Sequence, residues 1–142
     1  IGCTHMVFET SSHGIFYARN YGIDYDISVL TNISQDHLDL HGSMEHYIKT
    51  KSKVFTLKGK INGTDVDRCV IVNEDDEQKE YFLGKAPMQK TYGLSEQADI
   101  NASGIHIENG VTLFALESQK IPYQASTQLM GTFNISNILA AF

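Results

Sequence analysis

The sequence predicts an α/β fold in which a mostly parallel sheet is flanked by helices and followed by a small antiparallel β section. Arg68–Asn73 is an apolar, β-branched run typical of a strand buried on both faces. A polar loop follows a second expected strand, Tyr25–Thr31, where α/β folds place ligands. From Asp99 onward, apolar and polar residues alternate on both sides of Asn109-Gly110, a hairpin signal.

The first half of the chain alternates strand and helix patterns. In order, we expect a buried strand over Cys3–Thr10, a turn over 11–14, a short helix to about Asn20, the strand over Tyr25–Thr31, a polar loop over 32–42 and a helix over 43–57. Ser43 is expected to cap the last helix, and Glu45 suits its positive start.

The second half begins with the strand over Arg68–Asn73 and ends in a helix. We expect a helix over Glu74–Phe82 that stops near Gly84, a strand over Lys90–Gly93, about three antiparallel strands ending near Met130, and a helix over Phe133–Phe142.

Composition narrows the class of protein. A chain of 142 residues with 42% hydrophobic content suits one globular domain. The net charge of −6 and the lack of basic patches exclude a nonspecific nucleic-acid binder. Without a signal peptide or a membrane-length apolar run, we expect a cytoplasmic protein with no membrane partner, in which Cys3 and Cys69 are reduced core thiols. Both chain ends look cut, so we expect one partial domain over 1–142, truncated at both ends.

Lys51 is the sharpest observation from spacing alone. At about 100° per residue it falls within an apolar stripe of the expected helix, whereas Lys49 and Lys53 point elsewhere. The stripe consists of Met44, Tyr47, Ile48, Val54 and Phe55. Such a lysine extends its head to water, pairs with a carboxylate, or is an active-site lysine with altered chemistry.

Three acidic or imidazole side chains are candidate metal ligands. Glu9, at a strand end, is either a solvated carboxylate or a hard ligand for Mg²⁺. His37 and His41 are a zinc pair, two hydrogen-bonding loop histidines, or a pair of which one supports a Mg²⁺ or phosphate site. The zinc alternative is the weakest, since no His-Glu-x-x-His motif is present.

Two polar segments are candidate ligand contacts. Ser11 and its neighbours lack the Gly-x-Ser-x-Gly elbow of a serine hydrolase, so hydroxyls together with Arg19 binding an anionic substrate fit better. Asn134 and Asn137 share one side of a helix start, where they either cap the helix or contact the edge of an adenine.

Four motifs together resemble the central, ATP-binding domain of the Mur ligases, most closely the MurE-type UDP-N-acetylmuramoyl-tripeptide synthetases. The motifs are Glu9-Thr-Ser-Ser-His-Gly-Ile15, Thr31-Asn-Ile-Ser-Gln-Asp-His-Leu-Asp-Leu-His-Gly42, the helix from Met44 through Lys51 to Phe55, and Gly131-Thr-Phe-Asn-Ile-Ser-Asn-Ile-Leu-Ala-Ala141. They span most of the chain in the family's order, whereas residues 58–125 match only in pattern.

The resemblance implies a role for each matching residue. Glu9 and His37 would hold Mg²⁺ near the ATP γ-phosphate, and Lys51 would carry a carbamate. Ser11 and Arg19 would contact the UDP-N-acetylmuramoyl-dipeptide. Asn137 would contact the adenine, with Asn134 nearby. The family's phosphate-loop strand, its N-terminal UDP-binding domain and its C-terminal domain are expected to be missing, so the chain by itself should be inactive.

The implied reaction is the ATP-dependent addition of a diamino acid to UDP-N-acetylmuramoyl-L-Ala-D-Glu in peptidoglycan synthesis, through an acyl phosphate. Two alternatives stay open. One is another Mur-type ligase, similar to folylpolyglutamate or cyanophycin synthetase. The other is a noncatalytic module that kept the fold, although the joint presence of Glu9, His37 and Lys51 speaks against it.

Overall fold

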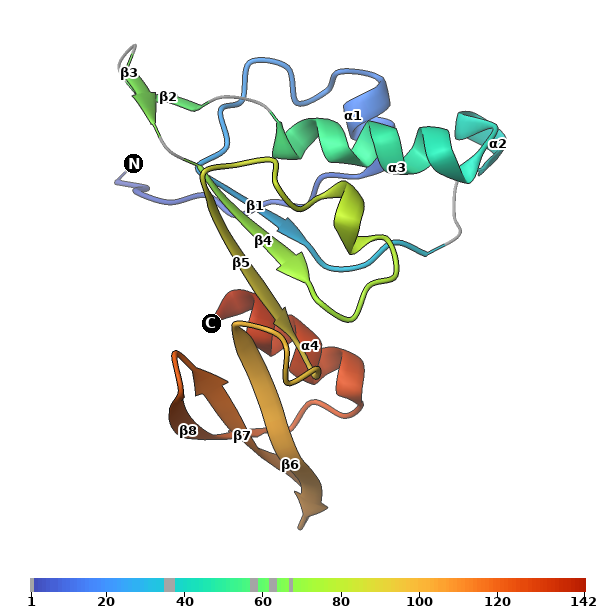
Figure 1. The fold of residues 1–142 in the computed structure, drawn as a ribbon. Coiled ribbons are helices and arrows are strands. Elements are labelled where there is room, and N and C mark those ends of the chain that lie inside the picture. The colour runs from blue at the N-terminus through green and yellow to red at the C-terminus, as the bar shows by residue number, and fades with distance from the viewer. Residues whose placement is uncertain (1, 35–37, 57–58, 62–63, 67) are drawn as a thin grey trace.

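Parallel and antiparallel strands form one continuous sheet in the computed structural model, which describes residues 2–34, 38–56, 59–61, 64–66 and 68–142 (Figure 1). The strands are β1 (Ile27–Leu30), β2 (Gly59–Ile61), β3 (Thr64–Val66), β4 (Cys69–Asn73), β5 (Met88–Gly93), β6 (Ile100–Glu108), β7 (Val111–Ser118) and β8 (Ile121–Thr127). The helices are α1 (Ser12–Phe16), α2 (Leu38–His41), α3 (Met44–Ser52) and α4 (Thr132–Ala141), with 3₁₀ turns η1 (Lys53–Phe55) and η2 (Lys79–Tyr81).

The sheet has the order β1-β4-β5-β6-β7-β8, and β2 pairs with β3 in a separate hairpin. β1, β4, β5 and β6 pair in parallel, whereas β7 and β8 are antiparallel. The predicted α/β class, with its antiparallel addition, is therefore confirmed. The carboxyl ends of β1, β4 and β5 consequently meet at one edge of the sheet, where open α/β sheets place ligands.

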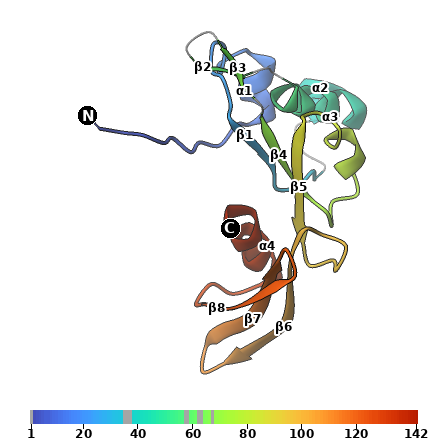
Figure 2. The ribbon, with the colours of Figure 1, turned by 60° about the vertical axis from the view of Figure 1, so that its left-hand side comes forward.

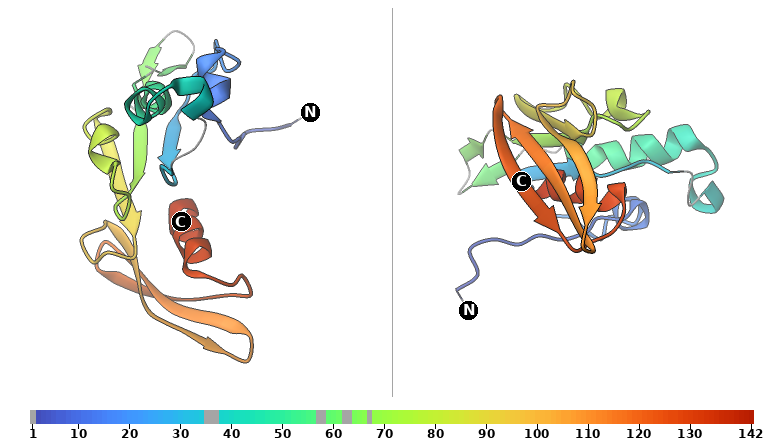
Figure 3. Two further views of the ribbon diagram at one scale, coloured as in Figure 1. Left: turned by 90° about the vertical axis from the view of Figure 1, so that its right-hand side faces the viewer. Right: turned by 90° about the horizontal axis from the view of Figure 1, so that it is seen from below.

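Two apolar cores lie on opposite faces of the curved sheet (Figures 2 and 3). Val70 and Val72 of β4 pack with Tyr47 and Ile48 of α3 on one face. On the other face α4 lies in the concavity of the sheet and packs on a second cluster, which consists of Tyr92, Ala102, Phe114, Leu116, Ile135 and Leu139. Burial on both faces explains why β4 has a continuous β-branched sequence.

Helix α3 confirms the predicted cap. The Ser43 side chain accepts a hydrogen bond from the backbone N–H of His46 at 3.2 Å. This bond satisfies one of the free amides of the first helical turn. The helix ends earlier than expected, at Ser52, and continues as the 3₁₀ turn η1, whose Val54 and Phe55 are buried. No helix of the described residues is both long and apolar enough to cross a membrane.

The predicted strand over Cys3–Thr10 is wrong. The segment is not part of the sheet, and Met6 and Val7 are 71% and 98% exposed. Apolar side chains alone do not make a strand; the backbone also needs a partner strand to pair with. In the described part of the chain none pairs with this segment, although the Phe8 ring lies 5.6 Å from that of Tyr25. Cys3 is exposed and so is not a core thiol, but Cys3 and Cys69 are both free cysteines as expected.

Two expected helices also differ. The first begins already at Ser12, inside the predicted turn, and ends at Phe16 rather than near Asn20. Glu74–Phe82 forms turns and only the short η2, not a helix. The reason lies in the acidic side chains: Asp76 accepts hydrogen bonds from the amides of Ile33 and Gln78, at 2.6 and 2.8 Å, and so competes with helical bonding.

The remaining elements follow the prediction closely. β5 includes the expected Lys90–Gly93, and α4 includes most of Phe133–Phe142. Asn109 and Gly110 form the β6–β7 turn with φ of 50° and 78°, the conformation that this pair favours. The next turn, between β7 and β8, places Gln119 and Lys120 at φ of 51° and 63°, where side chains with a Cβ are strained. The β2–β3 hairpin was not expected.

Candidate functional site

Two pockets flank the carboxyl end of β1, and Thr31 and Asn32 line both of them. The lysine pocket, of about 200 Å³, is lined by Glu9, Thr10, Ser11, Ser12, Thr31, Asn32, Ser34, Tyr47 and Lys51. The asparagine pocket, of about 250 Å³, is lined by Thr31, Asn32, Asn73, Asp75, Leu94, Thr132, Phe133, Ser136 and Asn137. The residues after β1 thus form a common wall between the α3 side and the α4 side of the sheet.

The lysine pocket brings together three residues that the sequence singled out. Glu9 comes from the extended N-terminal segment, Ser11 from the cap of α1, and Lys51 from the last turn of α3. They are separated by up to 42 positions in the sequence and meet only because α1 and α3 cover the same face of the sheet. The structure therefore places these three residues around one cavity, while their roles remain predictions.

Lys51 is only half-buried, and its ammonium lies over an aromatic ring. The Nζ atom is 5.2 Å from the centroid of Tyr47, whose side chain is 3% exposed. The ring face attracts a cation and fixes the direction of the lysine toward the pocket. Of the three possibilities for a lysine on an apolar stripe, the structure supports one in which the stem packs and the head reaches a polar cavity.

The start of α1 offers polar groups to the same cavity. The Ser11 side chain accepts a hydrogen bond from the Gly14 amide at 3.1 Å, which caps the helix. The Ser12 hydroxyl is buried and has no hydrogen-bond partner among the described residues. A buried hydroxyl without a partner costs free energy that a bound polar ligand can recover.

These groups fit a site for Mg²⁺ and phosphate oxygens. A carboxylate, several hydroxyls and a lysine head line the cavity, and Mg²⁺ prefers oxygen ligands with substrate phosphates completing its shell. Across the described residues, no three His, Cys, Asp or Glu side chains are grouped so as to hold a metal by themselves. His37, the other predicted ligand, lies outside the described residues.

The asparagine pocket separates the two asparagines of α4. Asn137 is exposed and lines the cavity. Asn134 does not line it; instead its side-chain amide donates to the carbonyl of Met130 at 2.8 Å. This bond is not a helix cap, because the N-cap of α4 is Gly131 and no side chain accepts a hydrogen bond from its first turn. The structure thus supports neither alternative for Asn134 and keeps Asn137 as the candidate ligand contact.

Phe133 and Asp75 are two of the lining residues of this pocket that the sequence analysis did not name as candidates. Phe133 is 67% exposed at the cavity, and its ring folds back over Gly131, where an added Cβ would lie 2.6 Å from the ring. Asp75 follows the end of β4 within an acidic run. The signal for Asp75 was its place two residues after the end of an expected strand, and the expected helix over Glu74–Phe82 hid this signal.

Two other candidates lie outside both pockets. Arg19 is exposed in the turn after α1, with its guanidinium 5.7 Å from the Tyr17 ring centroid. Its predicted contact with an anionic substrate stays a prediction. His41 is buried at 5% exposure and packs against the rings of Phe16, His46 and Tyr47, which is the environment of a core histidine.

Comparison with known proteins adds independent findings. The family model described as Mur ligase middle domain matches residues 1–142. UDP-N-acetylmuramyl-tripeptide synthetase 2 of Oceanobacillus iheyensis is 40% identical over 141 residues, which cover 99% of this chain and 28% of the relative. The UDP-N-acetylmuramoyl-L-alanyl-D-glutamate--L-lysine ligase of Staphylococcus aureus is 37% identical over 147 residues, with 99% and 28% coverage. The chain therefore spans less than a third of the length of these curated relatives.

Solved structures give the same result for the fold. A UDP-N-acetylmuramoyl-L-alanyl-D-glutamate--2,6-diaminopimelate ligase superposes with a TM-score of 0.78 at 29% identity, covering 93% of this chain and 27% of that one. MurF ligase from Thermotoga maritima, in complex with ADP, superposes with a TM-score of 0.71 at 16% identity, covering 93% and 29%. At 16% identity, the likeness to the Thermotoga maritima ligase shows a shared fold only.

Proposed function

Because the chain belongs to the family of Mur ligase middle domains, we propose that it is the ATP-binding domain of a larger ligase that adds a diamino acid to UDP-N-acetylmuramoyl-L-Ala-D-Glu. The observation that carries this proposal is the lysine pocket, in which Glu9, Ser11 and Lys51 meet beside the end of β1. Relatives at 36–40% identity are tripeptide synthetases and diaminopimelate or lysine ligases, which supports the substrate class.

The proposed reaction is amide formation through an acyl phosphate. The terminal carboxylate of the dipeptide substrate takes the γ-phosphoryl group of ATP, and the amine of the diamino acid then displaces phosphate. Bound Mg²⁺ supplies neutralisation of the phosphate charge. The domain contributes to catalysis by positioning the reactants and by stabilising charge, since phosphoryl transfer needs little covalent chemistry from the protein.

Each pocket has its own part in this function. Glu9 of the lysine pocket would hold Mg²⁺ as one ligand, with His37, which lies outside the described residues, as the other, and Ser11 would contact the dipeptide substrate. In the asparagine pocket Asn137 would donate to or accept from the adenine edge. The common wall of Thr31 and Asn32 would then lie between the base and the phosphates of one nucleotide.

Lys51 is proposed to act as a carbamate. The Lys51 ammonium would lose one proton, and the resulting neutral amine would add to CO₂ and release a second proton, so that a cation becomes an anion. The half-buried amine beside Tyr47, in a cavity shared with Glu9, suits a group that completes a cation site. A carbamate oxygen is a hard ligand of the type that Mg²⁺ prefers.

The proposal is tested by phosphate release from the full-length ligase that contains this chain. The assay supplies Mg-ATP, UDP-N-acetylmuramoyl-L-Ala-D-Glu and either diaminopimelate or lysine. We expect release that depends on the dipeptide substrate and on one of the two diamino acids, and no release from the 142-residue chain by itself. A folded full-length protein that releases no phosphate with either amino acid would contradict the proposal.

A further inference from the structure

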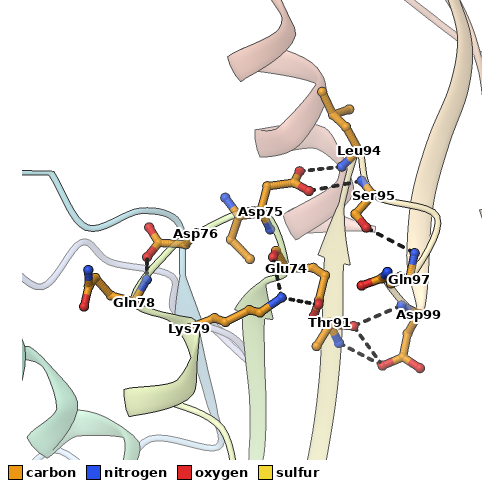
Figure 4. Close-up of polar contacts among 11 residues, drawn as sticks. Glu74, Asp75, Asp76, Gln78, Lys79, Thr91, Leu94, Ser95, Gln97 and Asp99 are labelled. Atoms are coloured by element: carbon orange, nitrogen blue, oxygen red, sulfur yellow. Dashed lines mark hydrogen bonds and ion pairs between the residues drawn. The ribbon is translucent and has the colours of Figure 1, made fainter.

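We propose that Asp75 is a positioning residue of the asparagine pocket: its carboxylate holds the loop after β5 in place, and this loop contributes Leu94 to the wall of the cavity that Asn137 also lines. This inference rests on the proposed function, because it assigns the pocket to the nucleotide. Figure 4 shows the polar contacts that carry it.

The Asp75 carboxylate accepts two backbone hydrogen bonds from the loop. The amide of Leu94 donates to Oδ2 at 2.6 Å, and the amide of Ser95 donates to Oδ1 at 3.1 Å (Figure 4). Hydrogen bonds to an ionised acceptor are about twice as strong as neutral ones. Because Asp75 and Leu94 both line the pocket, this bidentate contact fixes two parts of its wall relative to each other.

Gly93 shows how closely the carboxylate approaches the strand. A Cβ added at this position would lie 2.7 Å from Oδ2 and 2.9 Å from Cγ of Asp75. Real Cβ atoms do not approach so closely, so a side chain at position 93 would displace the carboxylate. The contact between Asp75 and the β5 loop therefore depends on glycine at position 93.

The neighbours of Asp75 hold the loop after β1, which contributes Thr31 and Asn32 to the same pocket. The Asn73 side-chain amide donates to the carbonyl of Thr31 at 2.8 Å, and Asp76 accepts from the amide of Ile33 at 2.6 Å. The segment after β4 thus fixes the loop after β1 on one side and the loop after β5 on the other. Of its side chains, only Asp75 spans from the pocket to the β5 loop.

Asp99 provides a matched carboxylate for comparison. It accepts from the backbone amide of Thr91 at 2.8 Å, near the far end of the same loop, and it does not line the pocket (Figure 4). Asp75 and Asp99 are both exposed, so removing the charge alters the solvation of either one similarly. A difference between the two variants therefore reports the position in the pocket rather than the loss of a loop hydrogen bond.

The test compares Asp75→Asn, Gly93→Ala and Asp99→Asn in the full-length ligase. We expect Asp75→Asn and Gly93→Ala each to raise the KM for ATP about tenfold, which corresponds to about 1.4 kcal/mol, at nearly unchanged kcat and dipeptide KM. Loss of uniform nucleotide binding has this signature. Asp99→Asn should keep the KM for ATP of the unaltered enzyme.

A second comparison separates positioning from general destabilisation. In Asp75→Ala the carboxylate is already gone, so adding Gly93→Ala should raise the KM for ATP no further. An unchanged KM for ATP in Asp75→Asn, or an equal rise in Asp99→Asn, would overturn the inference. Ligation by the unaltered enzyme is measured first, and if it is absent the proposed function fails instead. Folding of all variants is checked by circular dichroism. If the Asp75 and Gly93 variants fail to fold while Asp99→Asn folds, the result also contradicts a role limited to the pocket.

Discussion

The hydroxyl of Tyr92 donates a hydrogen bond to the carbonyl oxygen of Leu30 at 2.9 Å, across 62 positions of the sequence. Tyr92 is in β5 and Leu30 ends β1, two strands that are separated in the sheet by β4. The bond therefore joins the α4 face of the sheet to the last residue before Thr31, the common wall of both pockets. Tyr92 is fully buried, so neither partner can exchange this bond for water.

Removing that hydroxyl should destabilise the fold. Tyr92→Phe keeps the ring and leaves the Leu30 carbonyl without this donor, so the free energy of unfolding should fall by about 1–2 kcal/mol. Urea unfolding of the 142-residue chain measures it. Tyr81→Phe, at a 51% exposed tyrosine, is the matched control and should leave the midpoint unchanged. Equal stability of Tyr92→Phe and the unaltered chain would show that the bond contributes nothing.

The same tyrosine predicts a pH dependence. Burial raises the pKa of Tyr92 well above its ordinary value of about 10, and the carboxylates of Asp76 and Asp75 act in the same direction. The folded state thus holds the phenolic proton more tightly than the unfolded state. The resulting stability is fully present below about pH 10 and is lost as the pH rises above it. Unfolding measured between pH 8 and about pH 11 should show a decline that is smaller in Tyr92→Phe.

Lys51 can be tested by removing its amine in the full-length ligase. Lys51→Ala should abolish most of the phosphate release, and added short-chain carboxylates should restore part of it, because they can occupy the place of the proposed carbamate. Lys49→Ala, on the exposed side of the same helix, should keep full activity. Full activity of Lys51→Ala would remove the lysine from the catalytic site.

The two asparagines of α4 should respond in different ways. Asn137→Ala is expected to raise the KM for ATP about tenfold, the effect of about one hydrogen bond to a ligand, without a change in thermal stability. Asn134→Ala removes the bond to the Met130 carbonyl and should lower the free energy of unfolding by about 1 kcal/mol. Steady-state kinetics and thermal unfolding are measured for both variants. A raised KM for ATP in Asn134→Ala together with a loss of stability in Asn137→Ala would contradict these two assignments.

The β7–β8 turn offers a stabilising change. Replacing Gln119 and Lys120 by Asn and Gly should raise the free energy of unfolding by about 1 kcal/mol, since both positions have positive φ and this pair adopts it readily. Lys90→Gly, in the middle of β5, should have the opposite sign because glycine weakens a strand. A destabilised Asn-Gly variant would mean that the Gln119 and Lys120 side chains stabilise the turn in a way that outweighs the backbone strain.

Much of the fold could be predicted from local pattern. The β-branched run of β4, the alternation around Asn109-Gly110 and the cap at Ser43 each act within a few residues, so their sequence carries the information. The candidate site was also partly predictable: Lys51 stands out because it interrupts an apolar stripe, and the structure places it beside Glu9 and Ser11 in the lysine pocket.

The wrong predictions share one physical cause: the conformation of these segments depends on hydrogen-bond partners that are distant in the sequence. Met6 and Val7 have the side chains of a buried strand but no strand to pair with in the described residues. Glu74–Phe82 has helical spacing, yet Asp75 and Asp76 bind amides of the β5 and β1 loops instead.

By itself, the sequence determined the α/β class, the order of most elements and the residue types of the lysine pocket, because periodicity, capping and turn preferences are local properties. Only the tertiary structure decided that Thr31 and Asn32 separate two pockets, that Asn134 donates to the Met130 carbonyl while Asn137 lines a cavity, and that Asp75 holds a loop 19 residues away. These relationships arise where strand ends converge at one sheet edge, and that convergence depends on strand order and register, which no local pattern contains.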